Sequence, residues 1–163
     1  MMFKIQSSKT KDQSSKWGRS FTIHHLPFTI FLLFLGCKTV EPLDDATTNL
    51  NLWNEKKIEN YSFSFKRICF CPLEYVGPQQ VVVQNGKVVT VNGAAYNSSQ
   101  RYGVIPTIPE LLLTIKSHID KNPVKKTLNF NSTYGYPTSV FFDFSELMAD
   151  DELGYEVTNF KVN

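Results

Sequence analysis

Two cysteines separated by one residue are the side chains in this sequence whose type and spacing first suggest chemistry. They are Cys69 and Cys71, in the stretch KRICFCPL over residues 66–73. Such a pair can form a disulfide, bind a metal ion, take part in thiol–disulfide exchange or remain as two thiols. Two residues of extended chain span about 6.6–7.2 Å, whereas bonded cysteines have Cα atoms at most about 6.8 Å apart. A disulfide therefore needs a kink in the chain, and the disulfide and two free thiols both remain open.

Metal binding by this pair would need further ligands. Zinc takes four protein ligands, or three and a water molecule. Beyond residue 36 the sequence has one histidine, His118, at the edge of an apolar helical stripe. The carboxylates between Asp143 and Glu152 lack the Asp-x-Asp-x-Asp-Gly spacing of a calcium-binding loop, so we interpret this segment as a solvated loop. We predict no metal site and no cofactor.

Signatures of enzymes are missing from the sequence. It has no Gly-x-Ser-x-Gly, no His-Glu-x-x-His and no glycine-rich phosphate loop. A Ser-His-Asp or Cys-His arrangement would have to use His118, and nothing around that residue supports such a role. We therefore predict that the protein is not an enzyme.

The N-terminus has the parts of a secretory signal peptide. Residues 1–25 are polar and basic, and an apolar run of about 10 residues follows. This run is too short for a membrane-spanning helix, which needs about 20 residues. Residues 33–37, LFLGC, resemble a bacterial lipobox, whose cysteine becomes acylated and N-terminal. We predict a lipoprotein signal peptide over 1–36, lipidation at Cys37 and a polar tether over 37–49; the alternative is a signal peptide without lipidation.

Removal of this leader changes the charge of the chain. The sequence has 17 Lys+Arg and 15 Asp+Glu, of which residues 1–36 contain five bases and one acid. The remaining 127 residues have 12 bases and 14 acids, a net charge of −2. The basic balance typical of nucleic-acid binding is absent, and this length suits one domain, which we place at 50–163.

Periodicity predicts the elements that position the cysteine pair. Residues 50–60 have a loosely apolar helical face, with Asn49 as the N-cap. Residues 61–65 alternate as in a half-buried strand, which continues to Cys71. An arginine among the aromatic residues of that strand suggests a register shift near Lys66-Arg67.

A hairpin is the clearest signal in the middle of the chain. Asn85-Gly86 lies between the β-branched runs 80–84 and 87–91, and both turn residues readily adopt positive φ. We expect residues 92–106 to form a loop. The expected cross-strand pairs are Val83 with Val88 and Val82 with Val89.

The remaining chain predicts a helix followed by three strands. Thr107 and Glu110 have capping-box spacing, and the helix should end before Asn122. Its apolar stripe consists of Ile108, Leu111, Leu112, Ile115 and Ile119. The strands are expected over 127–131, 138–144 and 155–162. The fold class is therefore α+β in the order αβββαβββ: one mostly antiparallel sheet of about six strands with two helices on one face.

Several short motifs also occur in a fixed order over residues 50–162. They are Leu52-Trp53, Asn60-Tyr61-x-Phe63, Cys69-x-Cys71, Asn85-Gly86, Pro106-Thr107-Ile108-x-x-Leu111, Tyr134-Gly-Tyr-Pro137, Asp143 and Asp151-Glu152-x-Gly154-Tyr155. This ordered set resembles a family of small bacterial exported lipoprotein domains of unknown function. The resemblance implies an exported, often lipid-anchored α+β domain, and it implies no catalytic residues.

These patterns predict an exported, lipid-anchored, non-catalytic envelope protein that faces the periplasm or the cell exterior. Its partners would be the membrane, through the lipid, and an unidentified protein or small ligand, but no nucleic acid. The binding surface would be the open face of the sheet or two loops that carry Tyr102, Tyr134 and Tyr136, unless these tyrosines pack over the sheet edge. The alternatives are a thiol-active envelope protein that uses Cys69 and Cys71, and an inhibitor of an exported enzyme.

Overall fold

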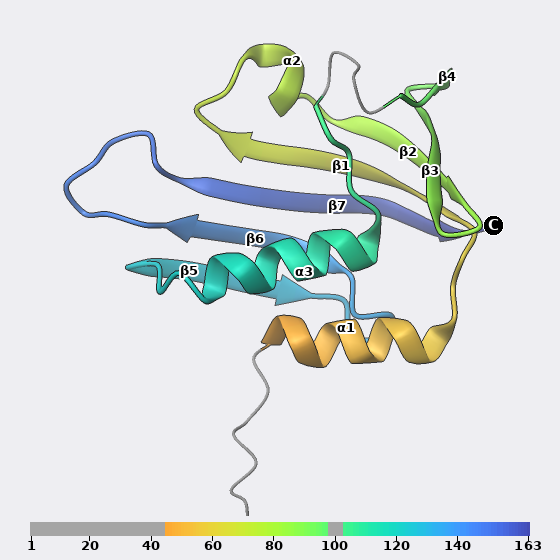
Figure 1. Ribbon diagram of the computed structural model, residues 1–163, viewed down its shortest axis with the longest axis horizontal. Helices are drawn as coiled ribbons and strands as arrows, with labels where there is room; N and C mark the ends of the chain where they lie inside the picture. The colour runs from red at the N-terminus through yellow and green to blue at the C-terminus, as the bar shows by residue number, and fades with distance from the viewer. Residues whose placement is uncertain (1–44, 98–102) are drawn as a thin grey trace, which may run out of the picture. The chain divides into compact units, whose positions relative to one another are not determined.

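The computed structural model describes residues 45–97 and 103–163. Within these residues, three helices and seven strands follow one another along the chain (Figure 1). In chain order they are α1 (Asp45–Lys56), β1 (Tyr61–Cys69), α2 (Leu73–Val76), β2 (Gln79–Gln84), β3 (Lys87–Val91), β4 (Ala94–Ala95), α3 (Ile108–Ile119), β5 (Lys125–Phe130), β6 (Pro137–Asp143) and β7 (Leu153–Val162). The predicted α+β class is confirmed.

All seven strands belong to one antiparallel sheet in the order β4-β3-β2-β1-β7-β6-β5. The first and last strands, β1 and β7, pair at its centre and join a meander of β1 to β4 with one of β5 to β7 (Figure 1). Because β4 and β5 form opposite edges, the connection through α3 has to cross the sheet. Helix α3 thereby covers one face.

The predicted number of about six strands is wrong, because β4 lies inside the expected loop over 92–106. Asn92 and Gly93 both have positive φ, 51° and 78°, and they turn the chain back so that β4 pairs with β3. A second Asn-Gly turn was therefore readable in the sequence, but only two residues of strand follow it. Helix α2 was also not predicted, since four residues are too few to show helical periodicity.

Helix α1 begins earlier than the sequence suggested. It starts at Asp45, and the side-chain amide of Asn49 donates a hydrogen bond of 2.7 Å to the carbonyl of Asp45. Asn49 is thus inside the helix and is not its N-cap, and residues 45–49 of the expected tether are helical. Lys57 follows the helix with φ of 52°.

Helix α3 begins with the predicted capping box. The amide of Glu110 donates to the Thr107 hydroxyl at 3.5 Å, and the amide of Thr107 donates to the Glu110 carboxylate at 2.8 Å. The next amide, of Ile108, donates to the hydroxyl of Tyr61 at 3.0 Å and ties the helix to β1. Burial raises the pKa of Tyr61 to about 12. The cap and this cross-link together fix where α3 starts against the sheet.

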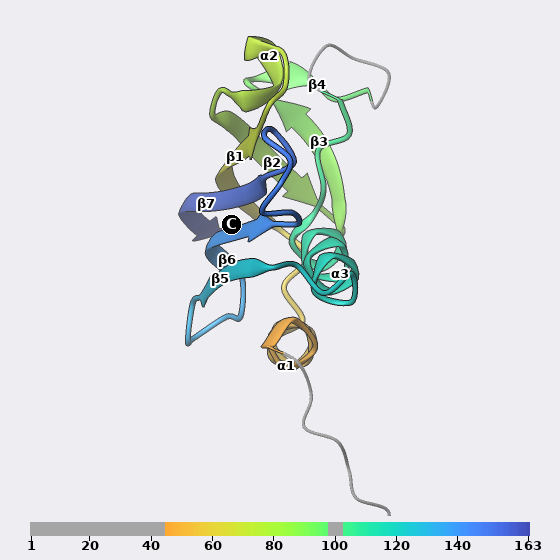
Figure 2. The same cartoon turned by 90° about the vertical axis from the view of Figure 1, so that its left-hand side faces the viewer.

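The core lies between the sheet and the two long helices, which pack side by side (Figure 2). The predicted stripe of α3 is buried, apart from the half-buried Ile119. Trp53 of α1 packs edge-on against Tyr61 and Phe160, at centroid distances of 5.1 and 5.7 Å. Both helices therefore bury apolar side chains in one core. We call the opposite face of the sheet, which no helix in the described residues covers, the open face.

Of the two pairs predicted for the hairpin of β2 and β3, one is confirmed and the other is wrong. Val83 lies opposite Val88 as expected, but Val82 lies opposite Thr90. Val89 is an extra residue in β3, so the pairing shifts by one between these positions.

Candidate functional site

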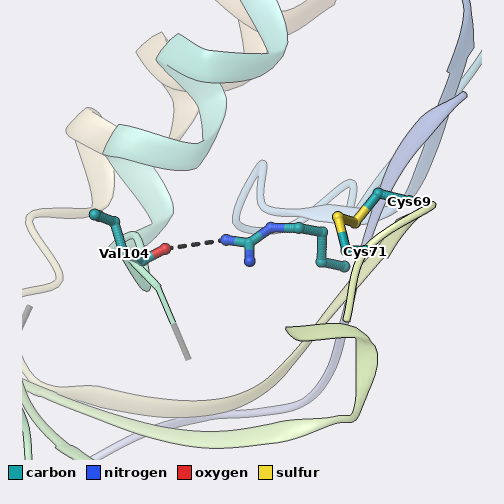
Figure 3. The surroundings of a disulfide bond; sticks show 4 residues. Cys69, Cys71 and Val104 are labelled. Atoms are coloured by element: carbon teal, nitrogen blue, oxygen red, sulfur yellow. Dashed lines mark hydrogen bonds between the residues drawn. A yellow bond between two sulfur atoms is a disulfide. The ribbon is translucent and has the colours of Figure 1, made fainter. Parts of the chain in front are cut away.

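The cysteine pair lies where β1 ends in a sharp turn. The amide of Cys71 donates a hydrogen bond of 2.9 Å to the carbonyl of Cys69, which leaves Phe70 at the tip of a three-residue turn. This turn supplies the kink that the sequence required, because it brings the two Cα atoms to 5.3 Å. The sulfur atoms are bonded at 2.07 Å (Figure 3). Cys71 is exposed and Cys69 is half-buried.

Arg67 precedes the disulfide on the helix-covered face of β1. Its guanidinium lies 5.6 Å from the centroid of the Phe65 ring and donates a hydrogen bond of 3.0 Å to the Val104 carbonyl, the dashed line in Figure 3. Stacking on a ring face allows an arginine to remain among aromatic residues. The register shift predicted at Lys66-Arg67 is therefore wrong; against β7 it lies between Ser62 and Ser64.

A pocket opens on the open face beside the disulfide. Ile68, Gly154 and Phe141 lie side by side on β1, β7 and β6. A Cβ atom on Gly154 would lie 2.7 Å from the Val140 carbonyl oxygen, so only glycine fits at this central position. The pocket has a volume of about 320 Å³. We call it the end pocket, and its lining residues are Ile68, Cys69, Phe70, Phe141, Asp150 and Glu152.

The acidic side of the end pocket comes from the loop between β6 and β7. Residues 143–152 contain five carboxylates and no basic residue. Both carboxylate oxygens of Asp151 are shielded from solvent, and no other described residue donates a hydrogen bond to them. Loss of hydration and the neighbouring carboxylates of Asp143 and Glu152 raise the pKa of Asp151, which its own backbone partly offsets. Among the described residues, no three potential metal ligands are grouped to hold an ion.

Large apolar side chains are exposed on the two loops that flank this end of the sheet. Phe70 is 82% exposed and Leu73 is 83% exposed in the turn and helix that follow β1. Leu147 is 97% exposed and Met148 is 63% exposed between β6 and β7. Both segments lie at the same end of the sheet (Figure 1). This surface was not predicted, because the acidic segment was interpreted as a solvated loop, although Leu147-Met148 among the carboxylates was a visible signal.

The tyrosines proposed for binding lie elsewhere. Tyr134 and Tyr136 are half-buried, and their rings lie 5.3 and 4.6 Å from that of Phe160. They belong to the turn between β5 and β6, at the end of the sheet opposite the disulfide (Figure 1). The structure therefore does not bring them together with Cys69 and Cys71. Tyr102 and Cys37 lie outside the described residues.

His118 is packed rather than presented to solvent. Its Nε2 lies 3.2 Å from the hydroxyl of Tyr155, and its ring lies against those of Phe142 and Phe144. Burial, and secondarily the charge of Lys121, lower the pKa of His118. The ring is thus a neutral member of an aromatic cluster at neutral pH.

The part of the chain that matches a known protein family coincides with this fold. A family profile matches residues 45–162, from the first residue of α1 to the last residue of β7, and it is described as a family of unknown function, DUF6174. The chain belongs to this family. No curated protein and no solved structure matches the chain. Membership of DUF6174 confirms the resemblance to a family of unknown function, whereas the bacterial lipoprotein character stays a prediction.

Within 45–97 and 103–163, no helix has the length and apolar character needed to cross a bilayer.

Proposed function

We propose that the protein is exported, is anchored to a membrane by lipid on Cys37, and acts by binding a partner rather than by catalysis. The exposed apolar side chains at the disulfide end of the sheet carry the binding part of this proposal. Large apolar side chains exposed together at one end of a folded domain are a feature of interaction sites. The signal-like leader that ends in LFLGC supports export and lipidation.

The rest of the open face is less suited to binding by burial of apolar surface. Next to the end pocket, Lys66 and Glu156 form an ion pair of 3.1 Å. Further along β1 and β7 the open face carries small polar side chains such as Ser62 and Thr158. Binding is therefore expected at the end of the sheet rather than across the whole open face.

Site-specific crosslinking in cells tests this function. A photoreactive phenylalanine analogue placed at Phe70 or Leu147 should give one discrete crosslinked product in the membrane fraction. The same analogue at Leu113, which is 54% exposed on α3, is the matched control and should give none. Equal crosslinking at all three positions, or none at any, would argue against a binding role of this end. A captured exported enzyme would identify the domain as an inhibitor.

A second candidate function is thiol–disulfide exchange, which the exposure of Cys71 favours. A thiolate on a partner protein would attack the Cys71 sulfur, form a mixed disulfide and release the Cys69 thiolate. A second thiolate on that partner would then release Cys71. The partner would leave with a disulfide, and this chain would keep two thiols. Exposed disulfides tend to be the more reducible ones.

Equilibration of the purified chain with glutathione buffers, followed by alkylation and mass measurement, separates these functions. A thiol-active protein should gain two alkyl groups in buffers near the poise of an oxidising compartment, about −180 to −210 mV. A pair that stays unlabelled there and reacts only under strong reductant is structural.

A further inference from the structure

The end pocket combines an apolar wall with an acidic rim, and this combination indicates the chemistry of the partner that it would bind. Resting on the binding function proposed above, we infer that the end pocket docks a segment of a partner protein that presents an apolar side chain flanked by lysine or arginine. The apolar side chain enters the pocket between Phe70 and Phe141. The cationic side chains pair with Asp150 and Glu152.

The apolar wall is built from three strands and is fixed by the sheet. Ile68 and Phe141 stand on either side of Gly154, where the neighbouring Val140 carbonyl and Ile68 side chain leave no room for a Cβ atom. Phe70 extends this wall outward from the turn that the disulfide closes. A volume of about 320 Å³ suits one side chain rather than a large ligand.

Among residues 45–97 and 103–163, the acidic rim has no cation of its own. Asp150 and Glu152 are exposed, and no lysine or arginine among the described residues lies within ion-pair distance of them. Lys66, which lies next to the end pocket on the sheet, already forms an ion pair with Glu156. Loss of hydration raises the pKa of Asp151, and the neighbouring carboxylates of Asp143 and Glu152 raise it further, so negative charge is crowded at this loop. A cationic partner would relieve that crowding and gain electrostatic steering.

The same charge argues against other occupants. Phospholipid surfaces and nucleic acids carry phosphates, which five carboxylates without a basic residue would repel. A second copy of this chain, related by a two-fold axis, would place the same acidic loop against itself. The exposed Phe70 and Leu147 extend beyond the pocket and therefore suit a protein surface rather than a small molecule.

Fluorescence anisotropy of labelled peptides, titrated with the full chain in mild detergent, tests this inference. The first peptide alternates lysine with phenylalanine and leucine; the second replaces its lysines by glutamate; the third replaces its apolar residues by serine. The first should bind saturably and weaken with added salt. The second and third should bind at least about tenfold more weakly, because the second lacks the cationic side chains and the third lacks the apolar ones.

Isosteric variants locate the site. Asp150→Asn/Glu152→Gln should weaken the first peptide at least about fivefold, and asparagine tolerates the φ of 75° at position 150. Glu55→Gln/Glu59→Gln, two exposed carboxylates at the end of α1, is the matched control and should change affinity less than about twofold.

Three outcomes would overturn the inference: no saturable binding, equal binding of the lysine and glutamate peptides, or equal weakening by both variants. If the peptides fail while the crosslink at Phe70 persists, the partner chemistry is wrong and the binding function stands. If the crosslink fails as well, both proposals fall.

Discussion

At the scale of single residues, the disulfide between Cys69 and Cys71 closes a very short segment of chain. The disulfide joins residues two apart in sequence, with Cα atoms at 5.3 Å. Loop-closure arguments assign such a small ring about 1–2 kcal/mol, against about 3 kcal/mol for a 15-residue loop. The bond therefore shapes the tip at Phe70 more than it stabilises the domain.

The first prediction follows from this ring size. Cys69→Ser/Cys71→Ser should lower the free energy of unfolding by at most about 2 kcal/mol, measured by urea denaturation. Wild type under reductant should behave like the variant. A loss much larger than this would mean that the turn is part of the folding core.

The second prediction concerns the shielded carboxyl of Asp151. Its pKa is raised from the ordinary value of 3.8, so ionisation costs folding free energy once the pH exceeds that value. The cost is nearly absent at about pH 2.5, where both states are protonated, and it is complete above the folded-state pKa. Asp151→Asn should therefore raise the melting temperature at pH 7 and leave it nearly unchanged at about pH 2.5.

Glu146→Gln provides the control for this pH dependence, because Glu146 is an exposed carboxylate of the same loop. It should leave the melting temperature unchanged at both pH values. Stabilisation by Asp151→Asn that is the same at low and neutral pH would show that charge is not its cause.

At the scale of elements, the turn between β5 and β6 holds helix α1 in place. The side-chain oxygen of Asn131 accepts hydrogen bonds from the amides of Thr133 and Tyr134, at 3.0 and 2.9 Å. Gly135 then takes φ of 80° directly against the backbone of Asn49 in α1. The turn and the helix thus contact each other without a side chain between them.

The third prediction compares two glycines that share a left-handed backbone. A Cβ on Gly135 would overlap the carbonyl oxygen of Asn49, whereas one on Gly86, with φ of 70°, would meet nothing within 4 Å. Gly86→Ala should therefore lower the free energy of unfolding by only about 1–2 kcal/mol, the cost of a Cβ atom on a left-handed backbone. Gly135→Ala should lower it by at least about 3 kcal/mol, since α1 must also shift.

Urea denaturation of both variants measures this difference. Equal losses would mean that α1 moves away from the turn without cost. Loss of the Trp53 fluorescence signature in Gly135→Ala alone would locate the damage at α1, because Trp53 is the buried anchor of that helix.

Local signals predicted most elements of this fold. The capping box at Thr107, the Asn85-Gly86 hairpin and the alternation from Tyr61 to Phe65 depend on near neighbours, and the structure contains each of them. The start of α1 was misplaced because Ala46, a buried residue of its first turn, precedes the apolar pattern from which the helix was predicted. Arg67 was misread because its carbonyl acceptor, on Val104, is 37 residues away in sequence, although its ring partner Phe65 lies on the same strand.

At the scale of the whole molecule, the candidate site depends on strand order. Ile68 is far in sequence from Phe141 and Asp150, and it meets them only because β1 pairs with β7 and β7 with β6. No local pattern contains that pairing. The cysteines could be found from sequence, but the end pocket beside them could not.

The fourth prediction concerns the connection of this domain to a membrane. The leader predicts acylation of Cys37, and several acyl chains on one N-terminus bind a bilayer far more firmly than one, at about 0.8 kcal/mol for each buried CH₂ group. Cys37→Ala should therefore move the protein from the membrane pellet to the soluble fraction and abolish incorporation of a labelled fatty acid. Cys69→Ser/Cys71→Ser removes the other two cysteines and should change neither readout. Retention of the label in Cys37→Ala would place the lipid elsewhere, and the domain would then face its partner from a different attachment point.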